Sequence, residues 1–273
     1  MRGGFGVVVA VWLLAGAAFA DTLSFDGHVT QGGLVVGRTA PGTTIRLDGR
    51  AVRVSPDGLF LLAFARDAGP TAQLIAEFPD GRREARALTV ARRTFAVQRI
   101  DGLPSRQVSP SAADMARIQT DTALIAQARA ADTDAADFRS GFVWPVQGPI
   151  SGVFGSQRIL NGEPRAPHYG TDIVVPAGTP IAAVADGRVV LSERDMFFTG
   201  KTVMIDHGHG LTSVYAHMSE LAVTVGTRVA KGQIIGRVGA TGRVTAPHLH
   251  WGMAVFTTQI DPQLLVAPAV ATK

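Results

Sequence analysis

The residues Ala246-Pro247-His248-Leu249-His250-Trp251 place two histidines one residue apart, directly after a Gly/Thr-rich run at residues 239–242. If this stretch is a β-strand, His248 and His250 point to the same face, because side chains alternate along a strand. Imidazole nitrogen is a ligand that suits zinc. The pair therefore indicates a metal site, although many His-x-His pairs are ordinary surface histidines.

The distribution of histidine strengthens the metal hypothesis. The first 167 residues contain one histidine, His28, which we expect on a strand or at the surface. The other six lie between residues 168 and 250: His168, His207, His209, His217, His248 and His250. Such a concentration in one region points to a metal centre or a histidine-based active site.

His168 and Asp172 are four residues apart. Gly170 and the run Ile173-Val174-Val175-Pro176 favour an extended segment here, in which an even spacing places both side chains on one face. Two histidines and a carboxylate form a three-ligand set for catalytic zinc that leaves a fourth position for water. The spacing alone does not decide whether His248 or His250 is the second histidine.

The remaining histidines allow two interpretations. His217 follows a predicted strand at 211–216, so it is either a base or electrophile near the metal, or a hydrogen-bonded structural residue. The run His207-Gly208-His209-Gly210 predicts a hairpin turn, because glycine favours turns. We expect His207 and His209 at the surface and not among the ligands.

Composition limits the classes of function. The 273 residues are 46% hydrophobic and 18% charged, which is enough apolar material for one large or two modest domains. The chain has no cysteine, so it has no disulfide framework. Its formal charge of +4 fits an anionic polymer such as a cell wall, and without an arginine-rich tract it argues against nucleic acid.

The first twenty residues predict a signal peptide at 1–20. Met1-Arg2 gives a basic start, Val7 to Leu14 is a short apolar run, and Ala18-Phe19-Ala20 is a suitable cleavage site. A membrane anchor is the alternative, but the run is short for a spanning helix. We therefore expect an exported protein with no stable membrane anchor after cleavage.

The rest of the chain predicts a mainly β protein in three parts. Short strands and turns such as Asp48-Gly49 indicate a β-sandwich-like module at 21–104. A helical linker follows at 105–141, and glycine-separated strands predict an antiparallel β-sheet domain at 142–265, with a tail at 266–273.

The linker helix has clear start signals. Ser111 and Asp114 have the spacing of a capping box, and Pro110 stands at the expected helix start. Four residues then fall on one helical face: Met115, Ile118, Thr122 and Ile125. Acidic residues at 132, 134 and 137 suit a helix C-terminus poorly, so we expect fraying there.

The order of motifs adds a family resemblance. His168-x-x-x-Asp172, then Tyr215-Ala216-His217, then Pro247-His248-Leu249-His250 resembles the lysostaphin-type (LytM-like) zinc metallopeptidases over about residues 142 to 263. Further matching runs are Gly170-Thr171-Asp172, residues 176–180, Asp186-Gly187 and residues 226–233. The N-terminal part resembles the Ig-like modules that precede some of these peptidases.

The resemblance implies roles for five residues. His168, Asp172 and His250 would hold one zinc ion per chain, and His217 and His248 would be the two active-site histidines that do not bind it. The implied activity is hydrolysis of peptide cross-links in the peptide stems of peptidoglycan, in the periplasm or cell envelope or after secretion. Ala246, Trp251 and residues 197–200 depart from the family pattern and would change the substrate groove, not the metal chemistry.

Two alternatives come from other classes of protein. Some relatives are non-catalytic regulators that bind the wall and activate another hydrolase, but these usually lack ligands that this chain retains. Residues 223–238 also resemble lipoyl- or biotinyl-carrier folds. Lys231 lacks the flanking pattern of a modified lysine, and a carrier does not explain the histidines.

Overall fold

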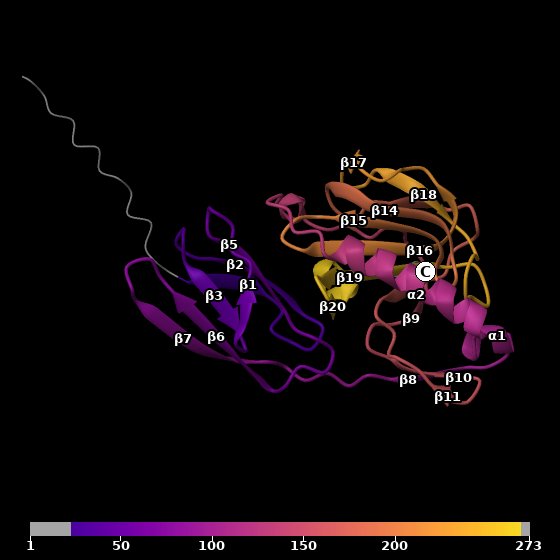
Figure 1. Ribbon diagram of the computed structural model, residues 1–273, viewed down its shortest axis with the longest axis horizontal. Helices are drawn as coiled ribbons and strands as arrows, with labels where there is room; N and C mark the ends of the chain where they lie inside the picture. The colour runs from indigo at the N-terminus through magenta and orange to yellow at the C-terminus, as the bar shows by residue number, and fades with distance from the viewer. Residues whose placement is uncertain (1–22, 269–273) are drawn as a thin grey trace, which may run out of the picture.

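The computed structural model describes residues 23–268, so the signal peptide predicted at 1–20 lies outside the described residues. This part of the chain is mainly β with one long helix, as predicted. An N-terminal module lies beside a larger C-terminal β region, and the long helix packs on the C-terminal region (Figure 1). No helix among residues 23–268 is long and apolar enough to cross a membrane.

The N-terminal module consists of two small sheets. Its strands are β1 (Ser24–Gly27), β2 (Leu34–Arg38), β3 (Thr44–Leu47), β4 (Arg50–Val52), β5 (Leu59–Ala63), β6 (Thr71–Glu77) and β7 (Arg83–Thr89). The sheets β1-β2-β5 and β4-β3-β6-β7 share one apolar core that includes Val35, Phe60 and Leu74. This arrangement agrees with the expected sandwich-like module, whereas the Ig-like resemblance remains a prediction.

The predicted Asp48-Gly49 hairpin is confirmed. Leu47 of β3 lies opposite Arg50 of β4. Asp48 and Gly49 have φ of +49° and +76°, the left-handed conformations that a two-residue type I′ turn requires.

The N-terminal module packs directly on the C-terminal region. Leu34, Leu59 and Leu61 belong to the same buried cluster as Val255 and Ile260. Fully burying one such side chain stabilises a fold by about 1.5–3 kcal/mol. The two regions therefore share a continuous core.

The linker contains α1 (Ser105–Val108), α2 (Ala112–Arg129) and the 3₁₀ turn η1 (Asp137–Ser140). The capping box is confirmed, because Ser111 and Asp114 exchange side-chain to backbone hydrogen bonds. The four residues predicted to share one helical face all lie in α2; Ile125 packs on the C-terminal region, whereas Met115 is 42% exposed. The buried face is instead formed by Leu124, Ile125 and Ala128, which pack against Leu191, Met196 and Met204.

The acidic residues after the helix have partners elsewhere. The helix ends at Arg129, before these acids. Arg53 of the N-terminal module forms ion pairs with Asp132 and Asp134, and Asp137 accepts two hydrogen bonds from Arg228. These acids therefore tie the segment after the helix to both neighbouring regions.

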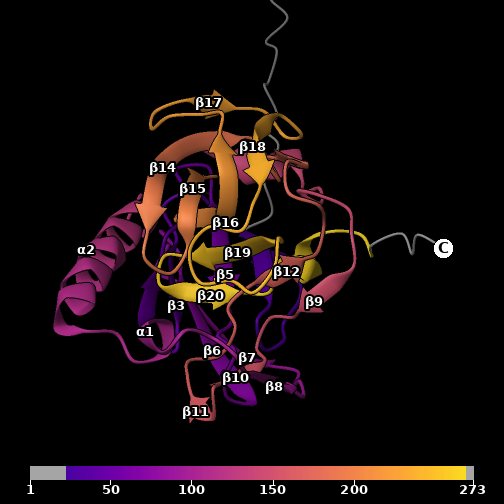
Figure 2. The ribbon, with the colours of Figure 1, turned by 90° about the vertical axis from the view of Figure 1, so that its right-hand side faces the viewer.

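The C-terminal region is built on a ten-stranded antiparallel sheet, which confirms the predicted fold class (Figure 2). Its main path runs β17-β14-β15-β16-β19-β12-β9. These strands are β9 (Ile150–Gly152), β12 (Thr171–Ile173), β14 (Gly187–Met196), β15 (Gly200–Asp206), β16 (Leu211–Leu221), β17 (Arg228–Val229) and β19 (Leu249–Val255). β13 (Pro180–Ala182), β18 (Ile234–Val238) and β20 (Thr258–Ile260) pair beside this path, and η2 (Pro262–Leu265) follows.

A second, smaller sheet connects the two halves of the chain. β8 (Val97–Ile100) pairs in parallel with β10 (Gln157–Leu160), which also pairs with β11 (Glu163–Pro164). β8 therefore contacts the C-terminal region, although the predicted division places it in the module at 21–104. The domain limits themselves remain a prediction.

Candidate metal centre and active site

Three neighbouring strands bring the predicted site residues together. Asp172 of β12 lies directly opposite His250 of β19, and Ala216 of β16 lies opposite His250 on the other side. The next pair, Tyr215 and Trp251, is fully buried. The backbone N–H of Val184 donates to the Tyr215 hydroxyl at 2.9 Å. Buried aromatic anchors thus fix the strands directly beside the site.

The side chains of His168, Asp172 and His250 converge on one small space. Asp172 Oδ1 lies 3.0 Å from His168 Nε2 and 2.8 Å from His250 Nδ1. The two nitrogens are 3.0 Å apart. The three ligating atoms all lie within 4.8 Å of one another, so a single ion could contact all of them.

Hydrogen bonding at His168 supports this donor set. His168 Nδ1 lies 3.2 Å from the Val153 carbonyl oxygen, which can only accept, so Nδ1 carries the proton and Nε2 presents a lone pair. A lone pair and a carboxylate this close repel one another unless a cation lies between them. Two imidazoles and one carboxylate with a free fourth position are typical of catalytic zinc, so the residues fit one zinc ion.

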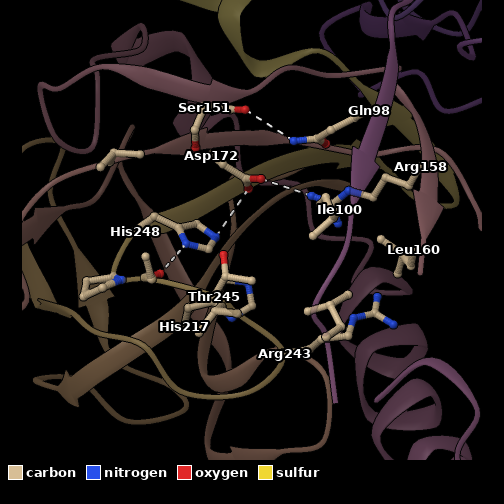
Figure 3. A pocket seen from close by; sticks show the side chains of 15 residues that line it. Gln98, Ile100, Ser151, Arg158, Leu160, Asp172, His217, Arg243, Thr245 and His248 are labelled. Carbon is tan, nitrogen blue, oxygen red and sulfur yellow. Dashed lines mark hydrogen bonds and ion pairs between the residues drawn. The ribbon is translucent and has the colours of Figure 1, made fainter. Parts of the chain in front are cut away.

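The geometry shows which of His248 and His250 belongs to the three-residue cluster, a choice that the sequence spacing left open. His248 lies just before β19, and its Nε2 is 3.9 Å from Asp172 Oδ1, farther than either other imidazole. Its Nδ1 donates to the Ala246 carbonyl at 2.9 Å. His248 therefore lies beside the three-atom cluster with its Nε2 directed toward it, as Figure 3 shows.

His217 is held in an unusual backbone conformation. Its φ is +64°, in the left-handed region that non-glycine residues seldom adopt. It lies where β16 stops pairing with β19 and begins to pair with β18. Its backbone N–H donates to the Thr199 carbonyl and its Nδ1 to the Thr241 carbonyl at 2.9 Å. The imidazole thus lies beside His248, with ring centroids 4.9 Å apart.

Two glycines make room for the cluster. A Cβ at position 152 would lie 2.4 Å from Asp172 Oδ2, and one at position 170 would lie 2.6 Å from His250 Cε1. Both distances are far below van der Waals contact. The close packing of the three ligands therefore requires glycine at these positions.

Arg158 was not anticipated from the sequence. Its Nη2 donates to Asp172 Oδ2 at 3.0 Å, and the Asp172 side chain is 8% exposed. Asp172 thus directs one oxygen to the histidines and the other to Arg158. An arginine ten residues before the first ligand has no spacing signal; backbone hydrogen bonds between His168 and residues 155–156 bring its segment to the site.

Burial lowers the pKa of two imidazoles. It lowers the pKa of His168 to about 4, although the neighbouring Asp172 carboxylate acts in the opposite direction. Burial, followed by the neighbouring His250 and His248, lowers the pKa of His217 to about 3. Burial alone would raise the pKa of Asp172, but the neighbouring imidazoles of His168 and His250 outweigh it and hold that pKa well below its usual range.

His207 and His209 correct the prediction of two surface histidines. Both are buried, at 0% and 1% exposed. His207 Nδ1 donates to the Asp186 carbonyl at 2.6 Å, and Nε2 lies 2.8 Å from Ser213 Oγ. His209 packs edge-on against Phe138. The linker covers this turn, because Phe138 and His209 donate backbone hydrogen bonds to the His207 and Thr133 carbonyls. His28 is exposed, as predicted.

Comparison with known proteins adds a family to this geometry. The model of Peptidase family M23 matches residues 166–262. The chain is 46% identical over 90 residues to peptidoglycan DD-endopeptidase ShyA of Vibrio cholerae, covering 33% of this chain and 21% of that protein. It is 34% identical over 149 residues to cell division protein DipM of Caulobacter vibrioides, covering 54% and 24%. The chain thus spans about a quarter of the length of these relatives.

A solved structure extends the similarity to most of the chain. A crystal structure from Pseudomonas aeruginosa, described as a candidate M23 peptidase, is 28% identical with a TM-score of 0.67. The match covers 86% of this chain and 94% of that one. Together with the matched motifs and the converging histidines, these comparisons identify residues 166–262 as a LytM-like domain of peptidase family M23.

Proposed function

We propose that this protein is a zinc-dependent endopeptidase that hydrolyses peptide cross-links of peptidoglycan. One observation carries the proposal: three ligating atoms converge within 4.8 Å, and the imidazoles of His217 and His248 lie beside them. In this proposal His168, Asp172 and His250 hold the metal, and His217 and His248 act on the substrate. The relatives named as peptidoglycan endopeptidases support the choice of substrate.

A zinc ion held by His168, Asp172 and His250 would supply Lewis-acid chemistry for a carbonyl and for a neighbouring water. Asp172 offsets part of the metal charge. Arg158 fixes the second oxygen of Asp172, so that the carboxylate presents one oxygen to the cluster. The chain thus orients a substrate amide above a rigid, mostly buried floor.

The hydrogen bonds of His217 and His248 define what they can do. In each, Nδ1 donates to a backbone carbonyl, of Thr241 and Ala246 respectively. A neutral imidazole that donates from Nδ1 has a lone pair at Nε2. His248 can therefore accept a proton from the attacking water and later donate it to the leaving amine. In the same tautomer His217 is not an oxyanion donor, since that role requires a proton on Nε2, and its lowered pKa makes it a weak partner base.

The proposed location follows from the substrate. Peptidoglycan lies outside the cytoplasmic membrane, so the enzyme acts in the periplasm or cell envelope after export through the predicted signal peptide. The net charge of +4 is compatible with an anionic wall polymer.

A mass-spectrometric profile of purified wall fragments tests the proposal. Sacculi are incubated with the full chain, with and without a zinc chelator, and with His217→Ala as a protein-matched control. We expect loss of cross-linked dimers that requires metal and His217, and the fragment masses identify the bond.

The non-catalytic alternative gives a different result in the same experiment. A regulator leaves the dimers intact even when metal analysis finds one zinc per chain. It instead increases digestion when a second wall hydrolase is added, and the increase survives in His217→Ala.

A further inference from the structure

Two turns of the chain hold His217 beside His248. The His217 backbone N–H donates to the Thr199 carbonyl at 2.8 Å, and its Nδ1 donates to the Thr241 carbonyl at 2.9 Å. A non-glycine residue with φ of +64° is strained and keeps that conformation only where its surroundings enforce it. The position of the His217 imidazole therefore depends on how firmly these two turns are held.

Regular strand pairing gives His217 little support. The register between β15 and β16 shifts just after the start of β15. β16 pairs with β19 up to Ala216 and with β18 from Met218, so His217 lies between two ladders. Its backbone N–H bonds instead to a carbonyl of the β14–β15 turn, residues 197–199. This turn is therefore the main support of the His217 backbone.

The two turns are packed against each other. The Lys201 backbone N–H donates to Thr241 Oγ1 at 2.9 Å. A Cβ at position 200 would lie 2.2 Å from Thr241 Oγ1, so Gly200 is needed for this close approach. A displacement of the turn 197–199 would therefore be transmitted to Thr241, whose carbonyl holds the His217 imidazole.

The linker helix α2 holds the turn 197–199. Asp121 Oδ2 accepts a hydrogen bond from the Phe197 backbone N–H at 2.7 Å. Arg117 donates to the Asp195 carbonyl at 2.6 Å, and its guanidinium lies 5.9 Å from the centroid of the Phe197 ring, a distance that permits a cation–π contact. Arg117 and Asp121 are four residues apart, so both lie on the same face of the helix. Figure 2 shows α2 beside β14.

The helix contacts reach the site from outside the stretch that matches family M23. α2 (Ala112–Arg129) ends before the match begins at residue 166. The turn that it contacts belongs to residues 197–200, where the sequence departs from the family pattern. A segment that contributes no candidate ligand thus supports a residue of the candidate active site.

We propose that Asp121 is a positioning residue for His217. Through the Phe197 N–H it fixes the turn whose Thr199 carbonyl holds the His217 backbone, and Arg117 assists by binding the strand just before that turn. The inference rests on the proposed function, in which His217 acts on the substrate. Asp121 does not line the groove that His217 borders. Its loss should therefore displace the imidazole without removing a metal ligand.

The first test is the exchange of backbone amide hydrogens, measured by NMR on the full chain. In Asp121→Ala the Phe197 N–H loses its acceptor, so we expect the His217 N–H to exchange about tenfold faster. The ladder between β15 and β16 at residues 203–206 should keep its protection, which separates a local change from unfolding. Asp121→Asn keeps an oxygen that can accept from Phe197, so His217 should stay protected.

Hydrolysis of a cross-linked peptide supplies the second test. Asp121→Ala should lower kcat about tenfold, less than removal of His217, because a displaced imidazole remains partly effective. KM and zinc content should not change. Asp121→Asn should keep kcat within about twofold of the wild type. The control Gln127→Ala changes an exposed residue of the same helix and should leave kcat unchanged.

A double-mutant cycle decides whether Asp121 acts through His217. If it does, adding Asp121→Ala to His217→Ala should cause no further decrease in kcat, because the imidazole that Asp121 positions is already absent. A merely structural role would lower kcat by the same factor in both backgrounds. That additive result, or a loss of zinc in Asp121→Ala, overturns the inference.

Amide exchange keeps this inference separate from the proposed function. Unchanged exchange at His217 in Asp121→Ala overturns the inference even when the wild type hydrolyses the peptide. Faster exchange that Asp121→Asn prevents, in a protein that hydrolyses no cross-link, supports the positioning of His217 by Asp121 and rejects the endopeptidase.

Discussion

His217 and His207 lie in the same region of the molecule, and both are nearly inaccessible, at 8% and 0% exposed. Both also donate from Nδ1 to a backbone carbonyl. They differ at Nε2. In His207 it contacts Ser213 Oγ at 2.8 Å, whereas the His217 ring lines a groove beside the three candidate metal ligands. Burial alone therefore does not separate a structural histidine from a functional one, and the environment of the second ring nitrogen does.

The largest effect is expected from removing a ligand. Asp172→Ala takes away the one carboxylate of the cluster, so the protein should lose its zinc and its activity together. Loss of several kcal/mol of transition-state stabilisation predicts a decrease in kcat/KM of about 10³-fold or more. Metal analysis and peptide hydrolysis measure both effects. If Asp172→Ala keeps full activity, Asp172 is not a metal ligand.

Replacing His217 should reduce activity without reducing zinc binding. His217→Ala leaves all three ligands in place, so zinc content should stay close to one per chain. Activity should fall by about 10²-fold, the lower range for loss of a proton-transfer group, because His248 remains. If the zinc is lost as well, His217 supports the metal site and is not a separate base.

Arg158→Gln is expected to have an intermediate effect. It removes the hydrogen bond to Asp172 Oδ2 without removing a ligand. Removing a side chain that hydrogen-bonds a metal ligand in this way typically changes metal affinity by about 10–100-fold. Competition with a chromophoric chelator measures that affinity. Arg158→Lys should restore part of it, and unchanged affinity in Arg158→Gln contradicts the positioning role.

His207→Ala should lower stability without changing activity, in contrast to His217→Ala. The substitution leaves Ser213 without its imidazole partner and opens a cavity. The free energy of unfolding should therefore decrease by about 2–4 kcal/mol. Zinc content and activity of the folded protein should not change. Urea unfolding and peptide hydrolysis at low temperature measure the two properties, with the exposed His28→Ala as control.

The smallest effect is on the pH dependence of stability. Burial holds the pKa of His207 below its ordinary 6.5. Below pH 6.5 the unfolded chain therefore binds a proton that the folded chain excludes, and the contribution of His207 to stability declines as pH falls. The stability difference between wild type and His207→Gln should shrink by up to about 1.4 kcal/mol per pH unit below 6.5. A difference that is constant from pH 7.5 to 5.5 contradicts this account.

Much of the fold was predictable because local signals agree with tertiary pairing. The Asp48-Gly49 turn, the Ser111 capping box and the glycine-bounded strands from 181 to 238 each occur near their predicted places. The convergence of His168, Asp172 and His250 followed from motif order. Their roles in catalysis remain proposals that the variants above test.

The parts that sequence reasoning missed depend on contacts between distant segments. His207 and His209 are buried because residues 133–138 cover their turn. No local sequence pattern indicates that this segment covers them. Contacts with Leu191, Met196 and Met204 determine which face of α2 is buried. Arg158 reaches Asp172 because residues 155–156 hydrogen-bond to the His168 backbone, and its strand also pairs with the distant β8.

The parallel pairing of β8 with β10 brings together stretches of the chain that contribute different parts of the candidate site. All five histidine and aspartate positions of the candidate site lie within residues 166–262, the span of the M23 match. Gln98, Ile100 and Arg158, which shape one side of the groove, precede it. The candidate reactive residues and one wall of the groove beside them thus lie in separate stretches of the chain. Exchanging residues 97–100 between related proteins should therefore change one wall of the groove while the candidate metal ligands and Arg158 stay in place.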